Sequence, residues 1–234
     1  MIRLLDVIFS LLAMTFFSPF FLFLILVLRF SGEGEIFYSQ ERVGLNNKEF
    51  KLFKFATMNK NSPEYGHGNI TIKNDPRILP IGRFLRDTKI NELPQLLNIL
   101  KGDMSVVGPR PLVREGFDSY PKDLIAKISN IKPGISGLAS IILRNEEEIL
   151  AKTSSPEEFH SKTLVPYKAK LEIWYEERSN VKNYFLLILS TIIIIFSPKS
   201  AVVDKFFNEI PAPPENLKKI LNELWRKNKI NYQK

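Results

Sequence analysis

The sequence predicts a mainly helical α+β protein with a membrane anchor near its N-terminus. Three observations support this prediction: an uncharged apolar run, a short stretch with strand and turn signals, and several segments with helix start and stop signals. The 234 residues suffice for one domain with an anchor attached. We therefore expect an anchor over residues 1–30, a main domain over residues 31–200 and a basic C-terminal tail over residues 201–234.

The anchor is the run from Val7 to Leu28, which contains no charged residue and is long enough to cross a membrane as a helix. A signal peptide is disfavoured because the run is long and no small-x-small cleavage pattern follows it. Ser18-Pro19 interrupts the run, since proline removes a backbone donor and clashes with the preceding turn. Two structures stay open: a kinked transmembrane helix, and a re-entrant hairpin that enters one leaflet and returns.

A small β-hairpin and two short helices are expected next. Residues 37–57 have strand-like apolar content around the turn Gly44-Leu45-Asn46-Asn47. Residues 59–75 are polar and contain glycine and proline, which predicts a mobile loop. Residues 78–86 predict a short amphipathic helix. Pro94, the leucines after it and Lys101-Gly102 predict a second helix with a defined start and end.

The second half of the chain gives further helix signals. Asn145, followed by three glutamates, predicts a helix start. The apolar run from Phe185 to Phe196 is about half as long as a membrane span requires. It is therefore either a buried core helix or a helix lying on the membrane, with the nearby rings of Trp174, Tyr175 and Tyr184 at the interface. The lysine-rich tail after residue 211 predicts a surface helix.

Composition limits the chemistry. The formal charge of +8 indicates an anionic partner: nucleic acid, an anionic membrane surface or a phosphorylated ligand. The absence of cysteine excludes disulfides, thiolate chemistry and cysteine-based metal sites. Because the only histidines, His67 and His160, lie far apart in the sequence, a bound metal is expected to be a hard cation held by oxygen atoms.

Candidate site residues are densest in residues 75–111, where arginines alternate with acids, glycines and prolines. The planar fork of arginine matches phosphate oxygens, and prolines on both sides of Arg110 would present it with little entropy left to lose. Glu92 precedes a predicted helix N-terminus, where amide donors favour phosphate. A carboxylate and a phosphate there need a cation between them, for which magnesium is the natural choice. Each feature alone also fits a turn, a cap or a surface ion pair, so the interpretation rests on their order and spacing together.

The stretch Asp75 to Pro111 resembles the signature of the bacterial sugar transferase family, the monotopic phosphoglycosyl transferases that begin surface polysaccharide biosynthesis. The resemblance extends to three further segments and to the Ser18-Pro19 pair. The segments are Gln40-Glu41-Arg42-Val43-Gly44, Lys54-Phe55-Ala56-Thr57-Met58 and Pro133-Gly134-Ile135-Ser136-Gly137. So many matches in order make a chance similarity improbable.

The resemblance implies a fold and a reaction. The anchor would be a re-entrant helix hairpin with both ends in the cytoplasm, and amphipathic helices would lie in the membrane interface. Such a protein transfers a sugar 1-phosphate from a nucleotide sugar, usually a UDP-sugar, to a polyprenyl phosphate such as undecaprenyl phosphate. An acidic nucleophile attacks the sugar-linked phosphorus, a nucleoside monophosphate leaves, and the acceptor lipid then attacks the phosphosugar-enzyme. Magnesium (Mg2+) is required.

Site residues follow from the resemblance position by position. Arg86, Arg110 and Arg144 would bind phosphate, and Glu92 with Asn91 would form the catalytic and magnesium-binding pair. The family has aspartate, its nucleophile, where this chain has Asn91, and a carboxamide is a poorer nucleophile and a weaker ligand for a hard dication.

Four explanations of Asn91 stay open. Glu92 takes over the attack; another acid such as Asp75 or Asp103 serves; transfer is direct; or the chain is slow or inactive. We favour Glu92, because the surrounding phosphate-binding residues look complete. A smaller departure is Ala56, where the family usually has a basic residue and for which Lys54 would partly compensate.

The expected location is the cytoplasmic face of a bacterial inner membrane. The expected partners are a nucleotide sugar, polyprenyl phosphate and membrane lipid, and a homo-oligomer stays open. A non-catalytic membrane protein that binds nucleotide sugar or anionic lipid is the main alternative. A nucleic-acid binder is supported by net charge alone, and no nucleic-acid motif accompanies it. The sugar is not identified by the sequence.

Overall fold

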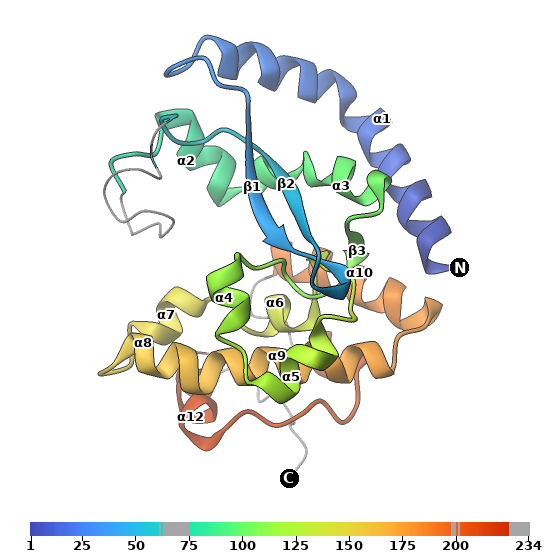
Figure 1. Ribbon diagram of the computed structural model, residues 1–234, viewed down its shortest axis with the longest axis vertical. Helices are drawn as coiled ribbons and strands as arrows, with labels where there is room; N and C mark the ends of the chain where they lie inside the picture. The colour runs from blue at the N-terminus through green and yellow to red at the C-terminus, as the bar shows by residue number, and fades with distance from the viewer. Residues whose placement is uncertain (61, 63–74, 198–199, 201, 225–234) are drawn as a thin grey trace. The chain divides into compact units, whose positions relative to one another are not determined.

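The computed structural model describes residues 1–60, 62, 75–197, 200 and 202–224 (Figure 1). Most of the predicted loop over residues 59–75, with His67, lies outside the described residues. The described chain is mainly helical with two small two-stranded sheets, which confirms the predicted α+β class at that level. The elements are α1 (Ile2–Arg29), β1 (Phe37–Val43), η1 (Leu45–Asn47), β2 (Glu49–Phe55), α2 (Pro80–Asp87), η3 (Ile90–Glu92), α3 (Gln95–Lys101), β3 (Ser105–Val107), α4 (Arg114–Asp118), α5 (Lys122–Ile128), β4 (Gly134–Ser136), α6 (Leu138–Ile142), α7 (Glu146–Leu150), α8 (Pro156–Phe159), η4 (His160–Leu164), α9 (Val165–Glu177), α10 (Val181–Phe196), α11 (Val202–Phe206) and α12 (Glu215–Leu224).

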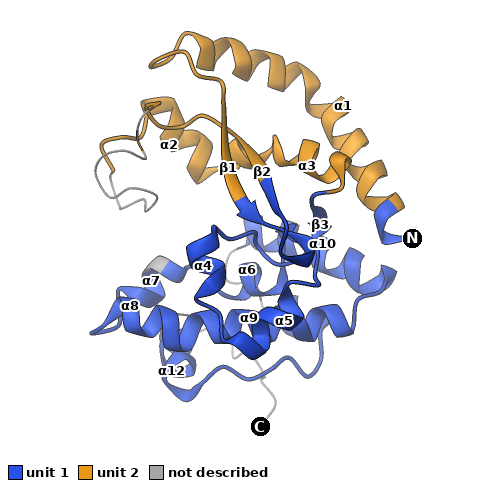
Figure 2. Cartoon of the chain, in the orientation of Figure 1, with its two compact units in different colours: residues 1–3, 42–50, 103–234 blue, residues 4–41, 51–102 orange. Residues whose placement is uncertain are grey.

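The chain forms two compact units (Figure 2). Unit 1 comprises residues 1–3, 42–50 and 103–234, and unit 2 comprises residues 4–41 and 51–102. Each unit has its own hydrophobic cluster. The expected division into anchor, main domain and tail is a division by role, and it stays a prediction.

Helix α1 is long and apolar enough to cross a membrane, and it runs through Pro19 as one helix. Proline has no N–H, so the carbonyl of Thr15 loses its usual helical donor. The hydroxyl of Ser18 donates to that carbonyl at 2.8 Å. The helix therefore does not break at Ser18-Pro19, where a neighbouring side chain satisfies the freed carbonyl. A kink at this point stays a prediction. The re-entrant hairpin stays a prediction.

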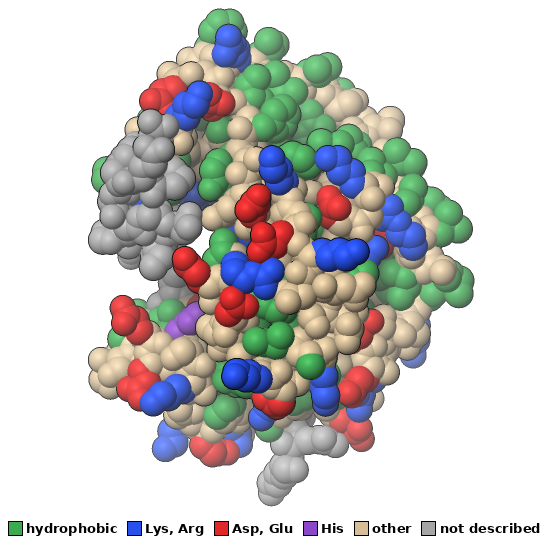
Figure 3. Space-filling model, viewed as in Figure 1, with side chains coloured by type: hydrophobic (Ala, Val, Ile, Leu, Met, Phe, Trp, Pro, Cys, Tyr) green, Lys and Arg blue, Asp and Glu red, His purple; other side chains and the backbone are tan. Residues whose placement is uncertain are grey.

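Most of α1 exposes large apolar side chains. Hydrophobic side chains gather along the edge of the molecule where α1 lies (Figure 3). The most exposed are Leu4, Leu12, Phe16, Leu22, Phe23, Leu26 and Phe30. A water-soluble surface rarely carries so continuous an apolar stretch, and such a stretch marks a protein or membrane contact.

The core of unit 2 joins the end of α1 to the strand and the short helices. Leu24 and Leu28 of α1 cluster with Phe55 of β2 and Leu85 of α2. At Gly82 of α2, an added Cβ would lie 2.2 Å from the carbonyl oxygen of Thr57, so only glycine permits this approach. The predicted hairpin, both predicted helices and the turn over residues 44–47 are confirmed. The turn includes two asparagines with positive φ, a conformation that asparagine tolerates better than most residues.

Unit 1 is organised around the short parallel pair β3 and β4, with Ser105 opposite Gly134 and Val107 opposite Ser136. An added Cβ on Gly134 would lie 2.2 Å from the backbone nitrogen of Gly108. The two glycine-containing segments of the signature therefore pack backbone to backbone. Beside them, residues of α4, α5 and α9 form a cluster that includes Phe117, Ile128 and Ala169.

Helix α10, the second apolar run, has one buried face, as a core helix would, and one exposed apolar face, as a helix lying on the membrane would. Tyr184 and Leu187 are buried in unit 1, whereas Leu189, Ile195 and Phe196 are exposed. The suggestion that Trp174, Tyr175 and Tyr184 are interface rings is wrong, since all three are buried. Tyrosine and tryptophan favour both cores and interfaces, so sequence alone does not separate the two environments.

The segment after α10 packs closely on unit 1. Phe207, Ile210, Leu217 and Leu221 are nearly fully buried. The hydroxyl of Tyr167 in α9 donates to the carbonyl oxygen of Pro211 at 2.9 Å. Helix α12 confirms the helix expected in the tail. Its leucines, Leu217 and Leu221, are buried against the rest of unit 1.

Candidate active site

The five predicted site residues fall in two groups. Arg86, Asn91 and Glu92 belong to unit 2, whereas Arg110 and Arg144 belong to unit 1.

Asn91 and Glu92 lie on the turn η3, between two apolar anchors. Ile90 and Leu93 pack against the core cluster of unit 2. Lys89, just before the turn, has a left-handed backbone with φ of 60°, an uncommon conformation for a residue other than glycine. The apolar anchors and this sharp turn fix the backbone that carries the two polar side chains.

Glu92 faces a cation. Its Oε1 lies 3.4 Å from Nζ of Lys54 on β2, and the side chains are only 12% and 17% exposed. In a partly buried setting an ion pair is screened less than on an open surface. The ammonium therefore stabilises Glu92 as an anion and restrains where its carboxylate can lie.

Asn91 is 7% exposed, and within the described part of the chain its Oδ1 has no hydrogen-bond partner. Buried polar atoms without a partner are rare in native structures and call for an explanation such as a missing ligand or ion. A carbonyl oxygen is a suitable ligand for a hard cation. Asn91 and Glu92 together therefore offer oxygen donors on consecutive residues.

These donors fit magnesium in a limited way. The described residues include no group of three or more aspartate, glutamate or histidine side chains placed to hold a metal. Magnesium is commonly bound through one or two protein carboxylates, with substrate phosphates and water completing its shell. A pair of protein donors suits a magnesium ion that arrives with a phosphorylated substrate.

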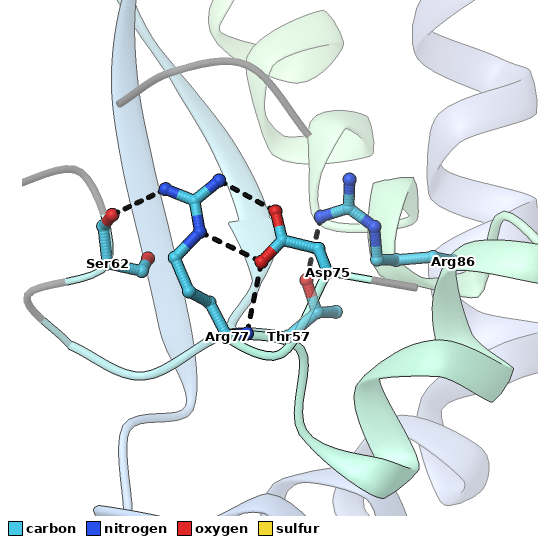
Figure 4. Close-up of polar contacts among 5 residues, drawn as sticks. All are labelled: Thr57, Ser62, Asp75, Arg77 and Arg86. Atoms are coloured by element: carbon cyan, nitrogen blue, oxygen red, sulfur yellow. Dashed lines mark hydrogen bonds and ion pairs between the residues drawn. The ribbon is translucent and has the colours of Figure 1, made fainter. Parts of the chain in front are cut away.

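Two arginines, Arg77 and Arg86, make further polar contacts near the end of β2 (Figure 4). Nη1 of Arg86 donates to Oγ1 of Thr57 at 3.4 Å. The guanidinium of Arg77 donates two parallel hydrogen bonds to the carboxylate of Asp75, at 2.9 and 2.7 Å. It donates a third to the carbonyl oxygen of Ser62 at 2.7 Å. Because Asp75 is buried and neutralised by Arg77, this arrangement argues against Asp75 as a substitute nucleophile.

Arg110 is exposed on a loop that is held on both sides. The carbonyl oxygen of Pro109 accepts a hydrogen bond from the N–H of Gly134 at 2.9 Å. The carbonyl oxygen of Pro111 accepts one from Nη1 of Arg42 at 3.2 Å. The loop therefore presents the guanidinium of Arg110 on a restrained backbone, at the rim of a small pocket that Phe117 and Tyr120 also line.

Arg144 has a structural contact. Its Nη1 donates to the carbonyl oxygen of Ile194 at 2.9 Å, in the last turn of α10. A cation near a helix C-terminus stabilises the unsatisfied carbonyls there. Its predicted role in phosphate binding stays a prediction.

Two side chains, one in each unit, make contacts that the sequence did not reveal. Lys54 is part of a matched motif, but only the fold shows that it meets Glu92. Glu172 of α9 is almost fully buried and accepts a hydrogen bond from the N–H of Ala139 at 3.0 Å. Burial raises the pKa of Glu172 to about 7. A single glutamate in a helical segment gives no sequence signal for such a role.

The chain is similar to known proteins over most of its length. A family model described as bacterial sugar transferase matches residues 1–198. The exopolysaccharide production protein ExoY of Rhizobium meliloti is 37% identical over 155 residues, which are 60% of this chain and 68% of that protein. The undecaprenyl-phosphate galactose phosphotransferase of Salmonella typhimurium is 37% identical over 158 residues, 62% of this chain and 33% of that protein.

A third relative, from Aeromonas hydrophila, is named UDP-N-acetylgalactosamine-undecaprenyl-phosphate N-acetylgalactosaminephosphotransferase. It is 34% identical over 139 residues, 58% of this chain and 33% of that protein. The matched region therefore spans about a third of the two phosphotransferases and about two thirds of ExoY.

Proposed function

Because the chain belongs to the bacterial sugar transferase family, we propose that it transfers a sugar 1-phosphate from a UDP-sugar to undecaprenyl phosphate and releases UMP. The observation that carries the proposal is the pairing of Glu92 with Lys54 beside the buried, unpartnered oxygen of Asn91. The names of two relatives support the acceptor, and one of them supports the donor class.

Glu92 is the proposed nucleophile. Its carboxylate oxygen forms a bond to the sugar-linked phosphorus, and the bond from that phosphorus to the UMP oxygen breaks, with UMP taking the electron pair. A phosphate oxygen of the acceptor lipid then attacks the same phosphorus. This second step restores the Glu92 carboxylate and forms the lipid diphosphate sugar. Lys54 holds the carboxylate in place before substrate arrives.

Asn91 and Glu92 are the proposed magnesium ligands. When bound, the ion neutralises charge on the diphosphate and so favours attack by an anion. Arg86, Arg110 and Arg144 are proposed phosphate contacts, for which the arginine fork is suited.

A membrane location follows from the acceptor and from the exposed apolar face of α1. We propose that the chain works at the cytoplasmic face of the inner membrane, with α1 as a re-entrant anchor. The chain has no natural cysteine, so single cysteines introduced at Arg3 and Arg29 report topology directly. Labelling of both from the cytoplasm is expected, and labelling from opposite sides would contradict the hairpin.

One alternative has a specific observation in its favour. Asn91 stands where the family has its aspartate nucleophile, so the chain can instead be a disabled member that binds nucleotide sugar without turnover. The buried oxygen of Asn91 suits metal or substrate binding in both cases. The two proposals differ in turnover, and they share a fold and a ligand class.

The deciding experiment measures UMP release from a panel of UDP-sugars with magnesium and undecaprenyl phosphate. The natural chain, Asn91→Asp and Glu92→Gln are compared at equal concentration. Turnover by the natural chain, with a loss of about a thousandfold or more in Glu92→Gln, is expected if Glu92 is the nucleophile. Turnover by Asn91→Asp alone would instead establish the disabled member.

A further inference from the structure

Asn98 of α3 holds the edge of β2 with its side-chain amide. The side chain is 0% exposed. Its Nδ2 donates to the carbonyl oxygen of Lys51 at 2.7 Å, and its Oδ1 accepts from the N–H of Phe53 at 3.0 Å. A residue of a neighbouring parallel strand would make the same two bonds, so the amide imitates a strand residue at this edge of β2.

These two hydrogen bonds of Asn98, here called the Asn98 clamp, join the segment that carries Lys54 to the segment that carries Glu92. Lys54 follows Phe53 on β2, and Glu92 lies at the start of the η3–α3 segment that carries Asn98. Nζ of Lys101, at the end of α3, also lies 4.5 Å from the ring centre of Phe53. The register of α3 along β2 is therefore fixed close to the 3.4 Å contact between Lys54 and Glu92.

We propose that Asn98 is a positioning residue: it holds α3 against β2 and thereby sets where the Glu92 carboxylate lies relative to Lys54 and the substrate phosphorus. The inference rests on the proposed function, in which Glu92 reacts. A misplacement of roughly 1 Å can cost about a hundredfold in rate, so a side chain that only sets register can control turnover.

A purely structural role would give a different result. Asn98 would then satisfy two backbone groups of β2 and contribute to stability alone, as many buried amides do. Turnover would then fall only in proportion to the amount of folded protein that is lost. The positioning role requires that turnover falls at equal stability and that the fall appears in kcat.

The experiment compares Asn98→Leu and Asn98→Asp with Ile99→Ala. Leucine removes both hydrogen bonds of Asn98 to β2. Aspartate keeps the acceptor for the N–H of Phe53 and loses the donor to the carbonyl oxygen of Lys51. Ile99 is fully buried on the same helix, so alanine there loosens packing and leaves the clamp intact. UMP release is measured well below the Tm of each variant, together with hydrogen exchange at the amide of Phe53. If Asn98→Leu does not fold, Asn98→Asp decides.

We expect kcat to fall about ten- to a hundredfold in the Asn98 variants, with KM for the UDP-sugar within about threefold of the natural value. Exchange at Phe53 accelerates in Asn98→Leu but not in Ile99→Ala. The proposal is overturned if kcat of the Asn98 variants falls no further than kcat of Ile99→Ala at matched Tm. It is also overturned if the loss lies in KM alone, or if exchange at Phe53 is unchanged in Asn98→Leu. Absence of UMP release by the natural chain would instead remove the proposed function, and the positioning role with it.

Discussion

Each of the two units holds a glutamate of low exposure, and the surroundings of the two carboxylates differ. In unit 2, Glu92 faces the ammonium of Lys54 at 3.4 Å. In unit 1, Glu172 accepts the N–H of Ala139 at the start of α6, and burial raises its pKa to about 7. A neighbouring cation favours the charged carboxylate, whereas burial favours the protonated form. The first environment suits a nucleophile, and the second suits a residue that joins two helices.

The difference also shows that low exposure is a poor guide to function. Glu92 lies on a turn that is restrained at both ends by core residues, whereas Glu172 lies within a helix that is buried on several sides. Only Glu92 combines restraint with an opposite charge. The catalytic proposal therefore depends on which group faces the carboxylate.

The most severe test of the Glu172 region is Gly137→Ala. The added Cβ would lie 2.4 Å from the carbonyl oxygen of Gly108 and 2.6 Å from Oε1 of Glu172. Because backbone on one side does not yield easily, we expect a loss of about 3 kcal/mol or more in the free energy of unfolding of unit 1. Denaturant unfolding in detergent measures it. Gly116→Ala is the control, since its nearest contact would be an ordinary 3.7 Å. Equal losses of unfolding free energy in the two variants would show that the close packing around Glu172 does not make Gly137 special.

The pKa of Glu172 makes a pH prediction. Between its ordinary value of 4.5 and about 7, the native state keeps a proton that the unfolded chain has lost. Stability therefore falls as pH rises through this window and levels off above it, by at most about 3 kcal/mol. Glu172→Gln is expected to remove this part of the slope.

A matched measurement isolates the effect of Glu172. Burial also raises the pKa of Asp204, to about 6, so Asp204 contributes to the slope in both proteins and cancels in the comparison. Burial opposes ionisation of Glu146, yet hydrogen bonds from His160 and Lys168 lower its pKa to about 2, so its contribution lies below pH 4.5. Parallel curves for the natural chain and Glu172→Gln would contradict the prediction.

The sequence predicted the elements whose signals are local. Pro94 and Gly102 bound α3 as expected, and Gly102 has the left-handed φ of 95° that favours glycine at a helix end. The Ser18-Pro19 interruption was expected because proline breaks a helix. The helix nevertheless continues without a break, and Ser18 satisfies the freed carbonyl. That contact is also local, but its geometry becomes clear only once the helix is built.

The candidate site was predicted only in part, for a physical reason. Spacing and resemblance pointed to Glu92, Arg86 and Arg110 as candidates, since those residues lie in short motifs. The contacts of Lys54 with Glu92 and of Asn98 with β2 join segments far apart in the sequence. A single sequence holds no signal for such pairs, because a lysine on a strand or an asparagine on a helix is ordinary by itself.

The mildest test concerns the cation that distinguishes the two glutamates. Lys54→Met keeps nearly the length of the side chain and removes its charge. We expect the free energy of unfolding to change by about 1 kcal/mol or less, as for other partly exposed ion pairs. Turnover is expected to fall about tenfold, because Glu92 loses the group that restrains its carboxylate. The control is Lys51→Met, at an exposed lysine of the same strand. A similar fall in Lys51→Met would mean that general charge near β2 matters, and the cation would then not distinguish Glu92 from Glu172.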